Sequence, residues 1–390
     1  MQNNREIWID WMRVIACLMV MVVHSTEPFY LGGDGSLIAS STDAFWSAFC
    51  DCLVRCCVPL FIVASAYLQF PIKYSTKEFF RKRAIRILIP FAIWTIVYAL
   101  AWGEPVQNFK DLLLNFNYAA GHLWFVYMIA GLYLIMPLLS PWAQKVGKRE
   151  LLFYMCLCLV TSFIPLIRDW VSETPAPVIH GTAGLPRPAL FPLWGEASWN
   201  AYGVFYYLSG FIGYMLLGLY LRKFVGDLSW KRTLAISIPA FLVGWGIAFG
   251  GFMRRVYISC DGVFPASGNV DKAVWWETTW CNDTIGVVLM TIALVLLLRK
   301  VKSDGRFYQK ILLPISKASY GMYLCHLLVL VYVCGFIREL FFPAEPEDGI
   351  LGFWTTPAVI FLSAIVTFFL VAIGSVLLQR IPKIGKFIIG

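Results

Sequence analysis

Charged residues are scarce in this chain of 390 residues, and their scarcity excludes an ordinary soluble protein. They make up 14% of the sequence, whereas hydrophobic residues make up 59%. About a quarter of a typical soluble domain is charged. The apolar runs are continuous and near the roughly 20 residues that cross a bilayer as a helix, which argues against a β-barrel. The sequence therefore predicts an all-α, polytopic bundle of membrane helices.

The chain also lacks the spacings that are typical of metal sites. Most of its 11 cysteines lie inside apolar runs, where a thiol acts as a small hydrophobe. It has no CxxC pair, and no two of its 4 histidines have ligand spacing. We therefore expect no metal. Cys260 and Cys281 share one loop, and the sequence does not decide whether they form a disulfide.

Apolar runs mark ten candidate spans. They lie at about residues 11–31, 45–70, 84–103, 120–140, 150–167, 202–222, 233–252, 284–300, 313–337 and 354–378. We interpret the first as a retained span rather than a cleaved export signal, because no apolar region precedes Arg13. No internal repeat is visible. We expect one membrane domain over residues 1–390, with no appended soluble domain.

Lys and Arg are unevenly divided between alternate loops. The N-terminal segment, every second loop and the C-terminal tail carry 21 of them, and the opposite loops carry 7. The positive-inside rule places the richer set, and with it both termini, in the cytoplasm. This topology accounts for the net charge of +9, so the lipid bilayer is an expected partner and nucleic acid is not.

Ionisable residues interrupt the first span. Arg13 and His24 are eleven positions apart, which places them on one helical face about 16 Å apart, and Asp10 joins the same side. Intramembrane ionisable groups indicate function by default. A neutral His24 with Glu27 nearby is a candidate general base. The structural alternative is a snorkelling arginine, a hydrogen-bonded core histidine and a solvated glutamate.

Two further histidines lie in predicted spans, and arginines lie at the predicted cytoplasmic ends of the first and third spans. His122 begins the fourth span and His326 lies in the ninth. Arg83 and the deeper Arg86 stand at the start of the third span. With Arg13 they are candidates to bind a phosphate-bearing ligand. Arg55 lies near mid-membrane, one turn after Asp51, either as a structural ion pair or as a substrate contact.

Five segments, taken in order, resemble the membrane-bound acyltransferase 3 family. Arg13 and His24 match its Arg-then-ten-then-His motif. Residues 55–68, 83–90, 121–137 and 319–326 are similar to its VPLFF…SGYL, R..RILxP, HLWFL…YL..P and SYGIYLxH segments. The fourth segment is especially similar to bacterial O-acetyltransferases that act on enterobacterial common antigen. One departure is Ala66 where the family usually has glycine, a change between two small residues.

The resemblance implies transfer of an acetyl group from cytoplasmic acetyl-CoA to a sugar hydroxyl of a surface glycan or a lipid-linked precursor. Arg13, Arg83 and Arg86 would hold the donor diphosphate. His24 would be either the general base of a direct transfer or the nucleophile that forms an acyl-histidine intermediate. His122, Tyr127 or Tyr323 would donate to the developing oxyanion. The implied location is the bacterial inner membrane, and succinyl-CoA is an alternative donor.

Two rival functions remain at this point. A transporter or exporter with a proton relay through His24, His122 and His326 fits ten spans with buried ionisable groups. A polysaccharide-assembly partner without enzymatic activity is the other. Two observations argue against the transporter: the sequence shows no inverted repeat, and its cationic cluster lies on one side of the membrane only.

Overall fold

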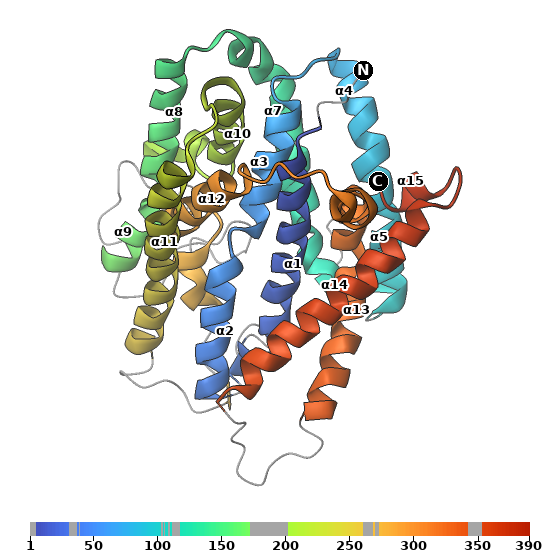
Figure 1. The fold of residues 1–390 in the computed structure, drawn as a ribbon. Coiled ribbons are helices and arrows are strands. Elements are labelled where there is room, and N and C mark those ends of the chain that lie inside the picture. The colour runs from blue at the N-terminus through green and yellow to red at the C-terminus, as the bar shows by residue number, and fades with distance from the viewer. Residues whose placement is uncertain are drawn as a thin grey trace.

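Helices make up most of the chain in the computed structural model, which describes residues 5–30, 37–38, 40–102, 104, 106–107, 110, 118–171, 202–259, 268–269, 273–341 and 353–390 (Figure 1). Two antiparallel strands of two residues each, β1 (Leu37–Ile38) and β2 (Gly268–Asn269), pair with each other. The predicted all-α class is confirmed. The loop that holds Cys260 lies outside the described residues, and with it the possible Cys260–Cys281 pair.

Most of the described residues belong to helices. In chain order they are α1 (Ile7–Tyr30), α2 (Ser41–Val54), α3 (Cys57–Gln69), α4 (Thr76–Arg83), η1 (Ala84–Leu88), α5 (Ile89–Ala101), η2 (Tyr118–Leu123), α7 (Trp124–Lys145), α8 (Lys148–Thr161), α9 (Ile164–Val171), η4 (Gly203–Leu208), α10 (Ile212–Phe224), α11 (Trp230–Ser259), η5 (Ala273–Trp280), α12 (Ile285–Leu298), η6 (Tyr308–Leu312), α13 (Leu313–Phe341), α14 (Thr355–Gln379) and α15 (Gly385–Ile388). The η elements are π-helical in η1 and η6 and 3₁₀-helical elsewhere.

Nine helical segments of the described chain are long and apolar enough to cross a membrane, and they match nine of the ten predicted spans. The exception is the predicted span 202–222. There the 3₁₀-helix η4 stops at Leu208 and α10 starts only at Ile212. Gly210, between them, has a φ of 72°, a left-handed conformation that an α-helix cannot contain. The prediction of one continuous helix at 202–222 is therefore wrong.

Two prolines explain interruptions in other spans. A proline lacks an N–H group, and its ring clashes with the carbonyl four residues earlier. For Pro59 that carbonyl belongs to Arg55, which lies at the break between α2 and α3. For Pro90 it belongs to Arg86, inside the π-helical turn η1 that joins α4 to α5. The π-turn thus lies at one of the predicted phosphate-binding arginines.

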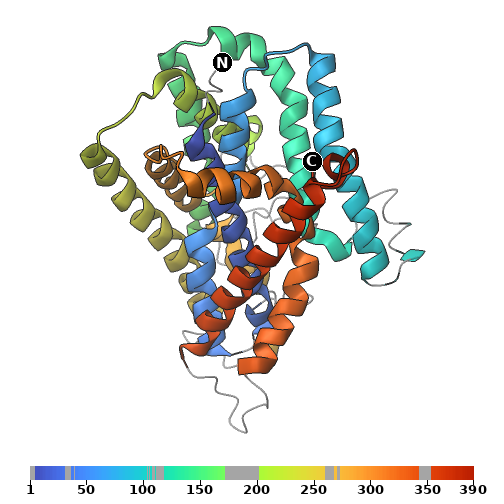
Figure 2. The same ribbon diagram turned by 45° about the vertical axis from the view of Figure 1, so that its right-hand side comes forward.

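Helix α1 lies inside the bundle. It packs against α2, α3, α13 and α14, and both ribbon views show helices on either side of it (Figures 1 and 2). On one side α11 packs on α12, and α10 packs on α3 and α8. Side chains of α1 belong to both large hydrophobic clusters of the core. Asp10, Ser25 and Thr26 on α1 are consequently buried in the protein interior.

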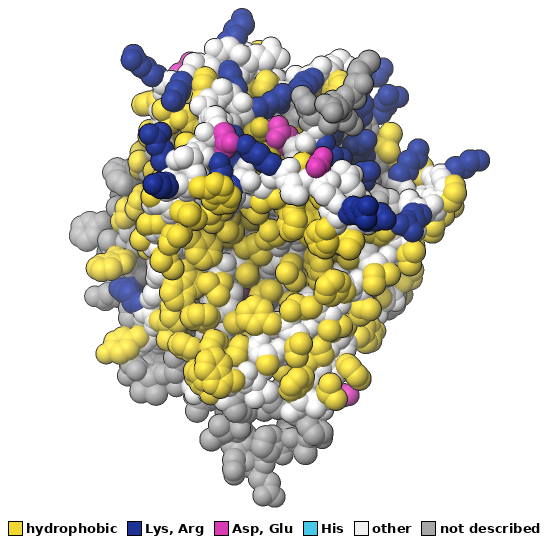
Figure 3. All heavy atoms as spheres, viewed as in Figure 1, with side chains coloured by type: hydrophobic (Ala, Val, Ile, Leu, Met, Phe, Trp, Pro, Cys, Tyr) yellow, Lys and Arg dark blue, Asp and Glu magenta, His cyan; other side chains and the backbone are white. Residues whose placement is uncertain are grey.

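The surface carries an apolar belt and a cationic end. In Figure 3 hydrophobic side chains cover most of the face, and Lys and Arg gather toward the end where α1 begins. An apolar belt bordered by cations is typical of a protein that spans a bilayer. The chain is thus a multi-pass membrane protein. The cytoplasmic position of this end stays a prediction.

Candidate active site

Three histidines that are far apart in the sequence converge beside α1. His24 comes from the second half of α1, His122 from η2 and His326 from α13. The ring centroid of His24 lies 6.1 Å from that of His122 and 5.1 Å from that of His326, and the latter two are 5.1 Å apart. We call these residues the histidine cluster. All three are candidate site residues predicted from the sequence, and the fold brings them together.

Glu27 contacts the cluster through His24. The Nδ1 atom of His24 lies 2.8 Å from Oε1 of Glu27. An ionised carboxylate can only accept a hydrogen bond, so Nδ1 carries the proton in a neutral His24 and Nε2 keeps its lone pair. This is the arrangement that a general base requires. The sequence prediction placed the two side chains close together, and the structure has them in contact.

The other two histidines hold unused hydrogen-bonding groups. Neither ring nitrogen of His122 has a partner among the described residues, although its side chain is buried. The Nδ1 atom of His326 lies 2.6 Å from the carbonyl oxygen of Tyr323, so it donates there and Nε2 has no partner in the described chain. A buried N–H without an acceptor is costly. His122 therefore has a donor available for an oxygen atom of a ligand.

Tyr323 supports the cluster instead of offering its hydroxyl to a substrate. Its hydroxyl donates to the carbonyl oxygen of His122. Its ring centroid lies 6.0 Å from that of His122 and 5.9 Å from that of His326. Tyr127 lies elsewhere: it is 49% exposed on α7 and its ring contacts Phe91. Of the three predicted oxyanion donors, the structure thus brings only His122 to the cluster with a free donor.

A cavity of about 460 Å³ extends from the cationic end toward the cluster, and we call it the arginine cavity. Besides Arg5, which pairs with Asp10, the cavity is lined by Arg13, Arg83 and Arg86. Within the part of the chain that the structure describes, these three guanidinium groups form no hydrogen bond or ion pair; that of Arg83 lies over the rings of Phe79 and Tyr133. Three cations without a protein anion form a site for a polyanionic ligand.

The arginine cavity reaches the layer of side chains next to the histidines. Phe125 and Tyr323 line it, and their ring centroids are 5.4 Å apart. Since the ring of Tyr323 also contacts His122 and His326, one aromatic layer separates the cavity from the histidine cluster. The predicted shared face of α1 thus has Arg13 at the cavity and His24 at the cluster.

A second cavity, which we call the His24 cavity, lies on the other side of the cluster. It has a volume of about 250 Å³ and is lined by His24, Glu27 and Pro28 of α1. Its remaining wall comes from α13 and consists of Leu327, Leu330, Val331 and Cys334. His24 does not line the arginine cavity, so it stands between two separate spaces.

Asp10 and Arg55 have structural partners. Asp10 accepts hydrogen bonds from Arg5 at 2.7 Å, from Tyr308 at 2.7 Å and from Ser316 at 2.6 Å, so it ties α1 to η6 and α13. The Nε atom of Arg55 lies 2.5 Å from Oδ1 of Asp51. Its guanidinium also lies 4.6 Å from the ring centroid of Trp280. The expected Asp51–Arg55 pair is therefore present.

Sequence reasoning missed several residues at these sites. Ser65, Gln69 and Tyr133 line the arginine cavity, and the hydroxyl groups of Ser65 and Tyr133 are 2.7 Å apart. Ser65 and Gln69 are one turn apart in an otherwise apolar helix, a signal that pointed to an inward-facing polar pair. Glu277 lies in a segment rich in acidic and aromatic residues, but that composition did not reveal that its Oε1 accepts from Tyr30 at 2.6 Å and lies 3.6 Å from Arg55.

Comparison with known proteins identifies the family of this chain. No curated protein and no solved structure matches the chain. A family model described as an acyltransferase domain matches residues 6–376, which include the histidine cluster and Arg13, Arg83 and Arg86. The chain therefore belongs to the acyltransferase 3 family and is a membrane acyltransferase.

Proposed function

We propose that this protein moves an acetyl group from acetyl-CoA to a sugar hydroxyl, with His24 as the general base. The observation that carries the proposal is the position of His24 between two cavities. One holds three arginines without an anionic partner in the described chain, and the other contains His24 and Glu27. An acyltransferase needs a donor and an acceptor that meet at one base, and this arrangement provides for both.

The donor side follows from charge. The diphosphate and 3′-phosphate of CoA carry several negative charges. The guanidinium group of arginine binds a phosphate through two parallel hydrogen bonds. In the proposal Arg13, Arg83 and Arg86 hold these phosphates, and the pantetheine arm extends past Tyr323 toward the histidine cluster. The positive-inside rule places this cavity at the cytoplasmic face, where acetyl-CoA is made. The membrane would be the bacterial inner membrane, with both termini in the cytoplasm.

The reaction that we propose is a direct transfer. Nε2 of His24 takes the proton from the acceptor hydroxyl, and the oxygen attacks the thioester carbonyl carbon. His122 donates a hydrogen bond to the oxyanion that develops. When the C–S bond breaks, the thiolate of CoA leaves and takes the proton from His24, so free CoA and the acetyl ester are released. Glu27 stabilises the imidazolium that exists between these two proton transfers.

The acceptor side is the His24 cavity. Its wall on α13 is apolar, while His24 and Glu27 supply its ionisable groups. The acceptor in this proposal is a hydroxyl of a cell-surface glycan or of a lipid-linked precursor. The similarity of one segment to O-acetyltransferases for enterobacterial common antigen makes that glycan the first acceptor to try.

The transporter alternative has one observation in its favour, the close spacing of three histidines, which suits a proton relay. An acetyl-transfer assay separates the two functions. Purified protein in nanodiscs receives labelled acetyl-CoA with and without bacterial glycan lipid extract, and unlabelled succinyl-CoA is added as a competitor. We expect extract-dependent release of CoA and a labelled lipid or glycan. Protein that binds no acetyl-CoA, or that binds it without any transfer, would contradict the proposal.

A further inference from the structure

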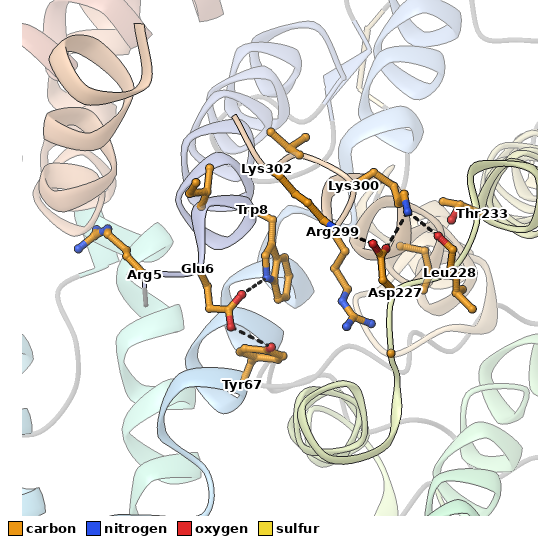
Figure 4. A pocket seen from close by; sticks show the side chains of 14 residues that line it. Arg5, Glu6, Trp8, Tyr67, Asp227, Leu228, Thr233, Arg299, Lys300 and Lys302 are labelled. Carbon is orange, nitrogen blue, oxygen red and sulfur yellow. Dashed lines mark hydrogen bonds and ion pairs between the residues drawn. The ribbon is translucent and has the colours of Figure 1, made fainter. Parts of the chain in front are cut away.

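A second cation-lined cavity lies at the same end of the molecule as the arginine cavity. Its volume is about 300 Å³, and it is formed by the first turn of α1, the end of α3, the start of α11 and the end of α12 (Figure 4). Arg5 lines both cavities, whereas Arg13, Arg83 and Arg86 do not line this one. Arg299 does, and we call it the Arg299 cavity. No step of the proposed acyl transfer uses it.

The guanidinium of Arg299 is held in place but has no anion. Its Nη2 atom donates to the carbonyl oxygen of Val225 at 2.7 Å, and its Cζ atom lies 5.9 Å from the ring centroid of Trp8. Among the described residues no carboxylate pairs with it, and in Figure 4 its tip points into the cavity with no dashed line to the other side chains drawn. Because a guanidinium has five N–H donors, most of them remain available.

The carboxylates that line this cavity are already engaged. Glu6 accepts from Nε1 of Trp8 at 2.8 Å and from the hydroxyl of Tyr67 at 3.3 Å. Asp227 pairs with Lys300 at 2.7 Å and also with Lys302. Hydrogen bonds from these two lysines lower the pKa of Asp227 to about 2, so it stays ionised and stays with them. Within the described chain, neither carboxylate forms an ion pair with Arg299.

A buried hydroxyl in the same wall also lacks a partner. Thr233 lines the cavity and is only 1% exposed, and its Oγ1 atom forms no hydrogen bond within the described chain. Burying a hydroxyl without a hydrogen bond is unfavourable. An oxygen-rich ligand in the cavity would satisfy both Thr233 and Arg299.

We propose that the Arg299 cavity binds a phosphate group, supplied either by the headgroup of an anionic membrane lipid or by free inorganic phosphate. Arginine is the side chain best suited to phosphate, and basic pockets between membrane helices near the cytoplasmic face bind anionic headgroups. Trp230 borders this region: it is 56% exposed, and Nζ of Lys300 lies 5.6 Å from its ring centroid. An exposed tryptophan beside a lysine is typical of the bilayer interface. The site does not depend on the proposed acetyl transfer.

Thermal unfolding of the purified full chain in detergent tests this site without any activity assay. The unfolding midpoint is followed while phosphatidylglycerol is added to the micelles, then phosphatidylcholine, and in a third series sodium phosphate at constant ionic strength. The variants are Arg299→Gln and Thr233→Val. Arg306→Gln is the matched control, because Arg306 is an exposed arginine just before η6 and does not line the cavity.

We expect the wild type and Arg306→Gln to be stabilised to the same extent by one of the two phosphate sources. Stabilisation by phosphatidylglycerol but not by phosphatidylcholine or phosphate identifies the lipid, and stabilisation by phosphate identifies the free ion. Arg299→Gln should need about tenfold more of that ligand, as expected for the loss of one charge-assisted contact. Thr233→Val should need about threefold more, as expected for one neutral hydrogen bond.

Two results would overturn the proposal. In one, Arg299→Gln and Thr233→Val respond like Arg306→Gln, or no phosphate source stabilises the wild type. In the other, the response is lost in Arg86→Gln but kept in both cavity variants, which would place the anion in the arginine cavity. Should Arg299→Gln fail to fold, Thr233→Val still decides the question, because valine keeps the shape of threonine and removes only the hydroxyl.

Discussion

The Nδ1 atom of His24 lies 2.8 Å from Oε1 of Glu27, one turn later on α1. This contact orients the imidazole ring and leaves Nε2 as the basic nitrogen. Both side chains line the His24 cavity, and the histidine ring also contacts those of His122 and His326. Substitutions of these two residues therefore test the proposed chemistry directly.

Replacing Glu27 by glutamine should slow catalysis without weakening donor binding. The glutamine side chain could still accept a hydrogen bond but would not stabilise an imidazolium at His24. We expect kcat to fall about 100-fold, within the range for acid–base groups, while the Kd for acetyl-CoA stays the same. The matched control is Glu150→Gln, since Glu150 is exposed and lines neither of the two cavities. It accepts a hydrogen bond from Nε1 of Trp142. An unchanged kcat in the Glu27 variant would remove Glu27 from the mechanism.

Replacing Arg13 by glutamine should weaken donor binding. The guanidinium of Arg13 lines the arginine cavity and has no hydrogen bond or ion pair within the described chain, so a bound phosphate would be its partner. Loss of one charge-assisted contact should raise the Kd for acetyl-CoA at least about tenfold. Isothermal titration would measure it, with the exposed Arg81→Gln as the control. Equal affinities for the two variants would argue against this donor site.

Replacing Asp10 by asparagine should destabilise the protein. Asp10 is 2% exposed and accepts hydrogen bonds from Arg5, Tyr308 and Ser316. Asparagine loses the charge and presents an N–H₂ group to at least one of these donors. Because Arg5 is partly exposed, the substitution should lower the free energy of unfolding by only about 2 kcal/mol. It would appear as a lower thermal midpoint in detergent, whereas Asp304→Asn on the exposed loop should leave the midpoint unchanged.

Local periodicity was enough to predict what lies along one helix. The spacing of Arg13, His24 and Glu27 requires only the α-helical repeat, and the structure has Arg13 at one cavity and the other two residues at another. The Asp51–Arg55 pair follows from the same rule, as the two are one turn apart. Nine spans were likewise predictable, because each is a continuous apolar run.

Tertiary contacts were not predictable in this way. Nothing in the sequence around His122 and His326 shows that their rings meet that of His24, since the meeting depends on how α13 and η2 pack against α1. The hydroxyl of Tyr323 was expected to face a substrate but donates to the backbone of His122. The break at Gly210 in the predicted span 202–222 depends on a backbone dihedral angle that composition does not reveal.

The most direct test of the central claim compares acetyl transfer and donor binding in one variant, His24→Ala. Single-turnover transfer from labelled acetyl-CoA to a glycan lipid extract is measured beside equilibrium binding of acetyl-CoA. Ser25→Ala is the matched control, because the buried hydroxyl of Ser25 only donates to the carbonyl oxygen of Met21 on the same helix. We predict that His24→Ala binds acetyl-CoA as the wild type does and transfers nothing above background, while Ser25→Ala stays active. Transfer by His24→Ala at the wild-type rate would contradict the assignment of His24 as the base.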